Sequence, residues 1–317
     1  MRPALRSTSW FAPTPPTVAI EIAGRRITVV ALAANAPVVT AYASEPLPEG
    51  AVVPAPSGVN IAQADIVVGT LKRTLDHAGL TSIKRAALVV PDSVARVSLL
   101  HFDQAPARAQ ELDEIVRWQV KKATPYPLEE ALVSHAQTTV DSTGLSVAAV
   151  VARRDVITQY ETVAAAVGIH AGLVDLASID VMNAIVAAGA STPGDWLLVH
   201  LAAEATTMAI LRGTTLMFYR HRTAADDETL SGLVHQTAMF HEDRLGGRSF
   251  DRVWLCGAGA GAEEAQWQIS SRLGIAVESV DVRPAADVRD QAVATPEVLD
   301  ALAAPVGLLI RERRRAA

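Results

Sequence analysis

The chain has 317 residues, 50% of them hydrophobic, and a formal net charge of −6. This length fits two domains of ordinary size, and no apolar run approaches the ~18–20 residues that a membrane-spanning helix needs. The acidic balance, without a basic stripe interleaved with aromatic residues, argues against a nucleic-acid partner.

The single cysteine, Cys256, excludes an internal disulfide and fits a reducing compartment. It ends an apolar strand pattern, so we expect a buried thiol rather than a nucleophile. Residues 1–16 contain Arg2, Arg6 and several prolines but no apolar core, which is unlike a signal peptide. We expect these residues to form a flexible tail.

Residues 17–94 begin with three short strands joined by tight turns, followed by a helix that stops at Gly79 and by a buried strand. The expected ranges are Val18–Ile22, Arg26–Leu32, Pro37–Ala43, Ile61–Ala78 and Arg85–Pro91. Residues 153–190 continue this half with a helix capped by Asp155 and ending at Gly168, a strand at Leu173–Asp175 and a helix at Ile179–Ala188. Ser191–Gly194 is the clearest linker.

Residues 195–317 repeat the same order of elements. The expected ranges are Trp196–Leu201, Thr206–Leu211, Leu216–Arg220, Asp226–Arg244, Arg252–Cys256, Gly261–Leu273 and Ile275–Val280, before a last helix capped by Thr295. The arginines at its end complement the helix dipole or contact anionic lipid, and we favour the dipole. Both halves thus read β-β-β-α-β-α-β-α, which predicts two related α/β domains that face one another.

An extra run, residues 95–152, interrupts the first half. It reads as a strand at Ala95–Phe102, an amphipathic helix, and two strands at Leu132–Thr139 and Ser146–Val151. We expect it to form a small inserted α+β subdomain.

The helix of this run ends in the string WQVKKATPYPLEE, residues 118–130. Pro125 disfavours helical geometry at the residue before it, and Pro127 holds the exit extended. The result is a stiff corner that presents Lys122 and Tyr126. Tyr126 is either an anchor for a partner or part of the core, and the sequence favours neither.

Three strings resemble the PilM family, the actin-like cytoplasmic proteins of type IV pilus assembly. They are PYPLEEALVSHAQ from Pro125, VDLASIDVMNAI at Val174–Ile185 and PVGLLIR at Pro305–Arg311. The resemblance covers nearly the whole chain. It implies an α/β fold of duplicated actin-like (ribonuclease H-like) domains with an FtsA-type inserted α+β subdomain. The first actin-like domain would comprise residues 17–94 and 153–190, and the inserted subdomain residues 95–152. The second actin-like domain, with a reduced capping subdomain, would comprise residues 195–317.

In this superfamily nucleotide lies between the halves, where two hairpins supply carboxylates for a hydrated Mg²⁺ and glycine backbones for phosphate. The first hairpin of this chain is VAIEIAGRRITVV, with Glu21 for the family's Asp and Ala23 for its Gly. Glu21 would displace a Mg²⁺-bound water by roughly 1.5 Å, the length of one carbon–carbon bond. Ala23 adds a Cβ where phosphate should meet bare backbone.

The second hairpin, LLVHLAAEATTMAIL, has His200 at the expected Asp and Ala202 at the expected Gly. Histidine is a poor substitute for a carboxylate toward Mg²⁺, which prefers oxygen ligands. We expect His200 to line the cleft or to be hydrogen-bonded within it rather than to act in catalysis.

The third element, CGAGAGAEEA, keeps Gly257, Gly259 and Gly261 between a strand and a helix. Such a turn either admits adenosine or reflects tight packing. The family's Gly-Gly turn after the third strand is replaced by Thr223-Ala224-Ala225. We therefore predict a pseudo-ATPase with a vestigial cleft, no metal and no cofactor, and keep weak binding of ATP and Mg²⁺ as the alternative.

The resemblance further implies a scaffold at the cytoplasmic face of the inner membrane. It would bind the N-terminal peptide of a PilN-like bitopic protein in a groove beside the insert, and link the pilus platform to its motor. Our candidate contacts are Lys122, Pro125, Tyr126 and Pro127. The competing hypotheses are a divergent ATPase or sugar kinase that uses Glu21 and His200, and a protein that binds nucleotide only structurally. The sequence leaves homo-oligomerisation and the identity of the secretion system open.

Overall fold

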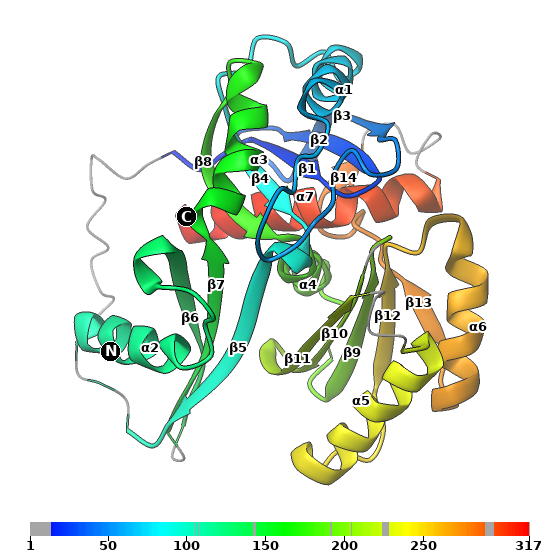
Figure 1. Ribbon diagram of the computed structural model, residues 1–317. Coiled ribbons are helices and arrows are strands. Elements are labelled where there is room, and N and C mark those ends of the chain that lie inside the picture. The colour runs from blue at the N-terminus through cyan, green and yellow to red at the C-terminus, as the bar shows by residue number, and fades with distance from the viewer. Residues whose placement is uncertain are drawn as a thin grey trace, which may run out of the picture.

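The first half of the chain forms a six-stranded sheet (Figure 1). The computed structural model describes residues 14–104, 106, 108–141, 144–190, 192–203, 205–223, 228–288 and 295–316. The strand order is β14-β3-β2-β1-β4-β8. The strands are β1 (Val18–Ile22), β2 (Arg26–Leu32), β3 (Val38–Pro46), β4 (Arg85–Val90), β8 (His170–Leu176) and β14 (Asp287–Val288). β1 to β3 are antiparallel, whereas β4 runs parallel to both β1 and β8.

The second half forms a five-stranded sheet with the same plan, in the order β11-β10-β9-β12-β13. Its strands are β9 (Asp195–Leu201), β10 (Ala205–Arg212), β11 (Thr215–Thr223), β12 (Arg252–Cys256) and β13 (Val277–Ser279). An antiparallel meander is again followed by parallel strands. The predicted duplication of an α/β domain is therefore confirmed.

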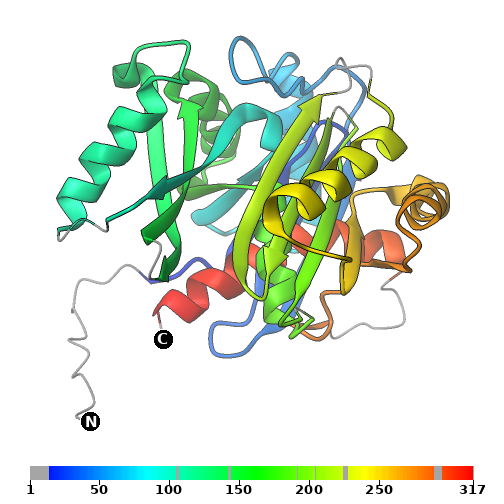
Figure 2. The same cartoon turned by 90° about the horizontal axis from the view of Figure 1, so that it is seen from below.

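Helices cover both faces of both sheets, so the central strands are apolar on each side, as buried parallel strands require. The outer helices are α1 (Ala64–His77) and α3 (Arg154–Ala166) on the first sheet, and α5 (Leu230–Leu245) and α6 (Ala262–Leu273) on the second. Figure 2 shows α5 lying across the outer face of the second sheet.

Two helices, α4 (Ala177–Ala187) and α7 (Pro296–Ala316), lie between the sheets (Figure 1). One continuous core joins Val30 of β2, Val181 of α4, Leu308 of α7 and Leu198 of β9. The two halves thus share a hydrophobic core. Although β14 and α7 belong to the range 195–317 by sequence, β14 pairs with β3 and α7 packs on the first sheet.

The insert has the expected elements: β5 (Ala95–Phe102), α2 (Ala109–Lys121), β6 (Ala131–Asp141) and β7 (Gly144–Arg153). Its sheet has the order β5-β7-β6, so β5 and β6 are both edge strands. Helix α2 covers one face of this sheet, through Leu112 and Val116 against Val147 and Ala149. Figure 2 shows α2 on the outer side of the insert.

Some boundaries differ from the sequence predictions. The helix predicted from Ile61 begins at Ala64, because Ile61 forms a bridge with Val52. The predicted cap Asp155 is wrong: Arg153 is the N-cap, and the Asp155 carboxylate binds Arg153 and the amide of Val156.

Residues 1–13 of the predicted tail lie outside the described residues. Positions 224 and 225 of the replaced glycine turn lie outside them as well. No helix within the described ranges is long and apolar enough to cross a membrane.

The central helices α4 and α7 approach one another closely at Gly307. A Cβ there would lie 1.8 Å from the carbonyl oxygen of Asp180 on α4. Any side chain would force α4 and α7 apart and disturb the shared core. Glycine at this position therefore sets how closely the helices pack.

We expect Gly307→Ala to lower the free energy of unfolding by about 3 kcal/mol, the range for an overpacked core. Gly69→Ala in α1 is the matched control, since the nearest atom to its Cβ would be an Arg73 side-chain nitrogen at 3.8 Å. That change should be neutral or stabilise the protein by up to about 1 kcal/mol. Denaturant unfolding measures both, and equal effects would contradict this interpretation.

Candidate functional site

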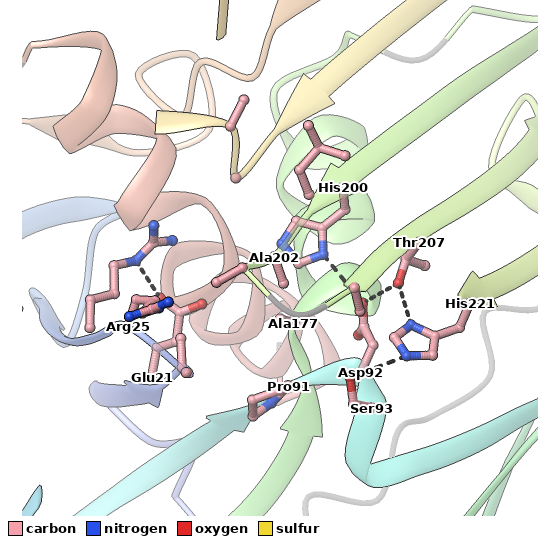
Figure 3. A pocket seen from close by; sticks show the side chains of 18 of the residues that line it. Glu21, Arg25, Pro91, Asp92, Ser93, Ala177, His200, Ala202, Thr207 and His221 are labelled. Atoms are coloured by element: carbon pink, nitrogen blue, oxygen red, sulfur yellow. Dashed lines mark hydrogen bonds and ion pairs between the residues drawn. The ribbon is translucent and has the colours of Figure 1, made fainter. Parts of the chain in front are cut away.

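A cavity of about 480 Å³ lies between the two halves (Figure 3). It is bordered by both β-hairpins and by the turn after β12. Six of the seven residues predicted for the cleft line it: Glu21, Ala23, His200, Ala202, Gly257 and Gly261. Gly259, the seventh, is not among the lining residues.

Glu21 is buried, and its carboxylate faces an arginine. The Nε atom of Arg26 lies 3.4 Å from Glu21 Oε2. The negative charge of Glu21 is the main cause that raises the pKa of Arg26, against the opposing effect of burial. The carboxylate of Glu21 is therefore paired with a guanidinium of the same hairpin.

His200 forms an ion pair with Asp92, which directly follows β4 and was not identified from the sequence. Its Nδ1 atom lies 3.2 Å from Asp92 Oδ2 (Figure 3). Burial alone would lower the pKa of His200, but the hydrogen bond and charge of Asp92 outweigh burial and raise it. Burial likewise opposes ionisation of Asp92, yet its hydrogen bonds bring its pKa down to about 2.

Asp92 accepts further hydrogen bonds from both halves of the protein. Ser178, at the start of α4, donates its backbone N–H at 3.0 Å and its hydroxyl at 2.9 Å to Oδ1. Thr207, on β10, donates its hydroxyl to Oδ2 at 2.7 Å. Asp92 and its partners His200, Ser178 and Thr207 are all buried, so this network joins the halves in a region of low dielectric.

The network fixes the direction of its next hydrogen bond. The Thr207 hydroxyl gives its one hydrogen to Asp92, so at the 2.9 Å contact it must accept from Nδ1 of His221. The other ring nitrogen of His221 lies 3.2 Å from the hydroxyl of Ser93. Asp92 therefore also orients His221, which lines the same cavity.

The sequence indicates Asp92 only by its place just after a predicted buried strand. The string AALVV predicts a buried strand, and Pro91-Asp92-Ser93 follows at its carboxyl end, where sites of α/β proteins gather. The partners of Asp92 lie 86 to 115 residues further along the chain. Only the folded chain brings them to it.

Three backbone amides of the cleft donate to acceptors within the protein. The amide of Ala23 donates to the carbonyl of Arg26, and that of Ala202 to the carbonyl of Ala205. The amide of Gly257 donates to the Asp300 carboxylate of α7 at 2.6 Å. These N–H groups are directed at protein acceptors, which leaves them poorly placed to receive phosphate.

Packing accounts for one glycine of the third turn. Gly257 has a φ of +84°, and a Cβ there would meet the Leu201 carbonyl oxygen at 1.9 Å. At Gly259 and Gly261 a Cβ would meet no atom within 4 Å. Cys256 just before them is buried, and burial together with the Asp300 charge raises the pKa of its thiol.

The predicted corner is formed by the exit of α2. The ammonium of Lys122 lies 3.5 Å from the centre of the Trp118 ring, and the guanidinium of Arg153 lies 5.1 Å from that of Tyr126. Tyr126 is partly buried and packs against the core of the insert. It also lines a second cavity, together with Pro125, whereas Lys122 and Pro127 line neither that cavity nor the central one.

Two further cavities flank the insert. One, of about 720 Å³, lies between the face of its sheet that α2 leaves uncovered and the edge strand β8. The other, of about 540 Å³, lies between β5 with the helix exit and the edge strand β11. The corner residues Pro125 and Tyr126 border this smaller cavity.

Residues 19–244 match the family model described as type IV pilus assembly protein PilM. This chain belongs to the PilM family. No curated protein sequence matches it. Among solved structures, it is similar to the PilM–PilN type IV pilus biogenesis complex, with 18% identity, a TM-score of 0.80, and coverage of 95% of this chain and 99% of the other.

More distant structures have a related fold. The ethanolamine utilization protein EutJ from Carboxydothermus hydrogenoformans has 12% identity, a TM-score of 0.50, and coverage of 94% of this chain and 90% of the other. A Bacteroides thetaiotaomicron protein described as having an actin-like ATPase fold has 10% identity, a TM-score of 0.48, and coverage of 88% and 95%. The central cleft of this PilM-family chain lies between the two halves of its duplicated actin-like fold.

The Asp92–His200 pair predicts a stability that depends on pH. Because the pKa of His200 is raised on folding, its contribution is full below the ordinary value of 6.5 and is lost as pH rises through the folded pKa. Because the pKa of Asp92 is lowered, its contribution is present above 3.8 and is lost as pH falls through about 2. The pair therefore stabilises most between about pH 4 and 6.

We expect the loss of unfolding free energy in His200→Gln to be largest in this range and to shrink toward pH 8. Denaturant unfolding at several pH values measures it. In an Asp92→Asn background the same change should lose its pH dependence. A loss that is constant with pH in the wild-type background would show that His200 is not paired as an imidazolium.

Proposed function

We propose that this PilM-family protein is a scaffold of a type IV pilus platform, with a central cleft that does not hydrolyse ATP. It would lie at the cytoplasmic face of the inner membrane and hold the N-terminal peptide of a PilN-like partner there. The family match and the similarity to the PilM–PilN complex support the partner. The composition of the cleft supports the lack of hydrolysis.

The observation that carries the pseudo-ATPase proposal is the pairing of both substituted hairpin residues. Glu21 binds Arg26, and His200 binds Asp92. For Mg²⁺ to bind through Glu21, it would have to displace the guanidinium of Arg26, and two positive charges would then share the site. ATP phosphates would also meet amides that already donate within the protein.

We expect calorimetric titration with ATP or ADP, with and without Mg²⁺, to give no saturable heat at millimolar nucleotide. Saturable binding without turnover would favour a structural nucleotide. Mg²⁺-dependent turnover that Glu21→Gln abolishes would overturn the proposal in favour of a divergent ATPase.

For the partner peptide we propose the larger cavity, which we call the β8 groove. Its floor is the uncovered sheet face of the insert, formed by the cross-strand pairs Leu132–Ala152, Ser134–Val150 and Ala136–Ala148. Its wall is β8, whose residues 173–176 line the groove and whose outer edge is not paired within the described sheet. An extended peptide can add to such an edge and place alternate side chains on the apolar floor.

One end of the β8 groove is polar. Arg311 of α7 contacts the Asp175 carboxylate and lies 3.4 Å from Asp180 Oδ1. Asp180 is fully buried, and burial followed by the charge of Asp175 raises its pKa. The end of α7 is thereby fixed beside β8, so the groove is bounded by groups that are already in place before a peptide binds.

The test is binding of a synthetic peptide with the N-terminal sequence of the PilN-like partner. Ala136 is exposed on the groove floor, so Ala136→Trp should fill the groove without disturbing the core. We expect it to weaken binding at least tenfold, measured by fluorescence anisotropy, with an unchanged Tm.

Tyr126→Ala is the contrasting variant, because Tyr126 is one of the four candidate contacts from the sequence and borders the other cavity. We expect it to leave the affinity for this peptide within about twofold. The reverse result, loss with Tyr126→Ala and none with Ala136→Trp, would place the peptide at the corner and refute the β8 groove.

A further inference from the structure

The cavity between β5 and β11 is lined by positively charged side chains. We call it the Arg cleft, after Arg96, Arg220 and Arg222, which all line it. None of its lining residues within the described ranges is Asp or Glu. The cleft is therefore a concentration of positive charge on a chain whose net charge is −6.

Two of these arginines have neutral hydrogen-bond partners. Arg96 is exposed on β5 and donates to the carbonyl of Ala123, at the end of α2. Arg220 donates to the amide oxygen of Gln236 on α5. Burial, and then the positive charge of Arg222, lower the pKa of Arg220. The negative charge of Glu228 opposes this lowering.

Arg222 is the exception, since it pairs with Glu228 at 3.3 Å. This pair is partly exposed and contributes little by itself. A carboxylate arriving in the cleft would meet the guanidiniums of Arg96 and Arg220, whose hydrogen-bond acceptors are the uncharged oxygens of Ala123 and Gln236. Charge-assisted hydrogen bonds from arginine to carboxylate are among the stronger polar contacts available to a partner.

The walls of the cleft fit an extended chain. β11 and β5 are the edge strands of two different sheets, and both border the cleft. An extended peptide can add to the edge of a sheet through backbone hydrogen bonds. Apolar surface lies between the arginines, on Val97, Pro125 and Tyr126. A strand that alternates acidic and apolar side chains would satisfy the charges and the apolar surface together.

We propose that the Arg cleft binds an acidic, extended segment of a partner protein. This site lies at the β5 edge of the insert sheet and shares with the β8 groove only the lining residue Ala95. Arginines line both sites, but the Arg cleft has no acidic lining residue within the described ranges, whereas the β8 groove contains Asp175. Variants at Arg96 and at Ala136, each of which lines only one of the two sites, therefore distinguish them.

The probe is a fluorescein-labelled peptide of eight residues that alternates Glu and Val, the length of β5. We expect saturable anisotropy at low ionic strength that weakens at least fivefold in 0.5 M NaCl, where charges are screened within about 4 Å. Arg96→Ala should weaken binding at least fivefold, and Tyr126→Ala about threefold. Arg248→Ala, an exposed arginine outside the cleft, is the matched control and should change nothing.

Reversal of the charge at Arg96 is the decisive experiment. Arg96→Glu should abolish binding of the Glu–Val peptide and gain binding of a Lys–Val peptide that the wild-type protein ignores. Ala136→Trp should leave Glu–Val binding unchanged, which separates failure of this proposal from failure of the β8 groove. Unchanged Glu–Val affinity in Arg96→Glu would overturn the proposal. Complete displacement of the Glu–Val peptide by millimolar inorganic phosphate would also overturn it, because it would indicate an ion site.

Discussion

One buried carboxylate constrains how the two halves meet. Asp92 lies at the end of β4, where ionisation is costly without partners, and it is satisfied by Ser178 from its own half and by His200 and Thr207 from the other. Removing one member of such a network leaves the others buried and unpaired, which costs more than the pair contributes. The relative position of the two sheets is thus tied to a polar contact as well as to the core around α4 and α7.

The same contact belongs to a cleft whose charged groups are paired within the protein. His200 is paired with Asp92, and Glu21 is paired with Arg26. Each of these two cleft residues therefore has its own counter-charge within the fold. Such pairing stabilises groups that would be costly to bury alone.

The insert, in contrast, borders cavities on its uncovered sheet face and at its edge strand β5. Its three-stranded sheet has one face covered by α2 and one face open to the β8 groove, and its edge β5 borders the Arg cleft. Ser93 and His221 line both the Arg cleft and the central cavity, so the Asp92 network forms the wall between them. A partner bound in the Arg cleft would be separated from the Asp92 network by little more than Ser93 and His221.

The sequence by itself determined the repeated order of elements, because burial on both faces of a sheet leaves apolar runs of strand length that turns and glycines separate. It located β1, β2, β5 and β12 to the residue and identified six residues of the central cavity. Only the tertiary structure decided what those residues bind, since Asp92 and His200 are 108 positions apart. It also decided that Gly257 is required by packing against Leu201 and that α7 returns to the first sheet. Local patterns record which side chains are buried, whereas partners across a fold depend on how distant segments pack.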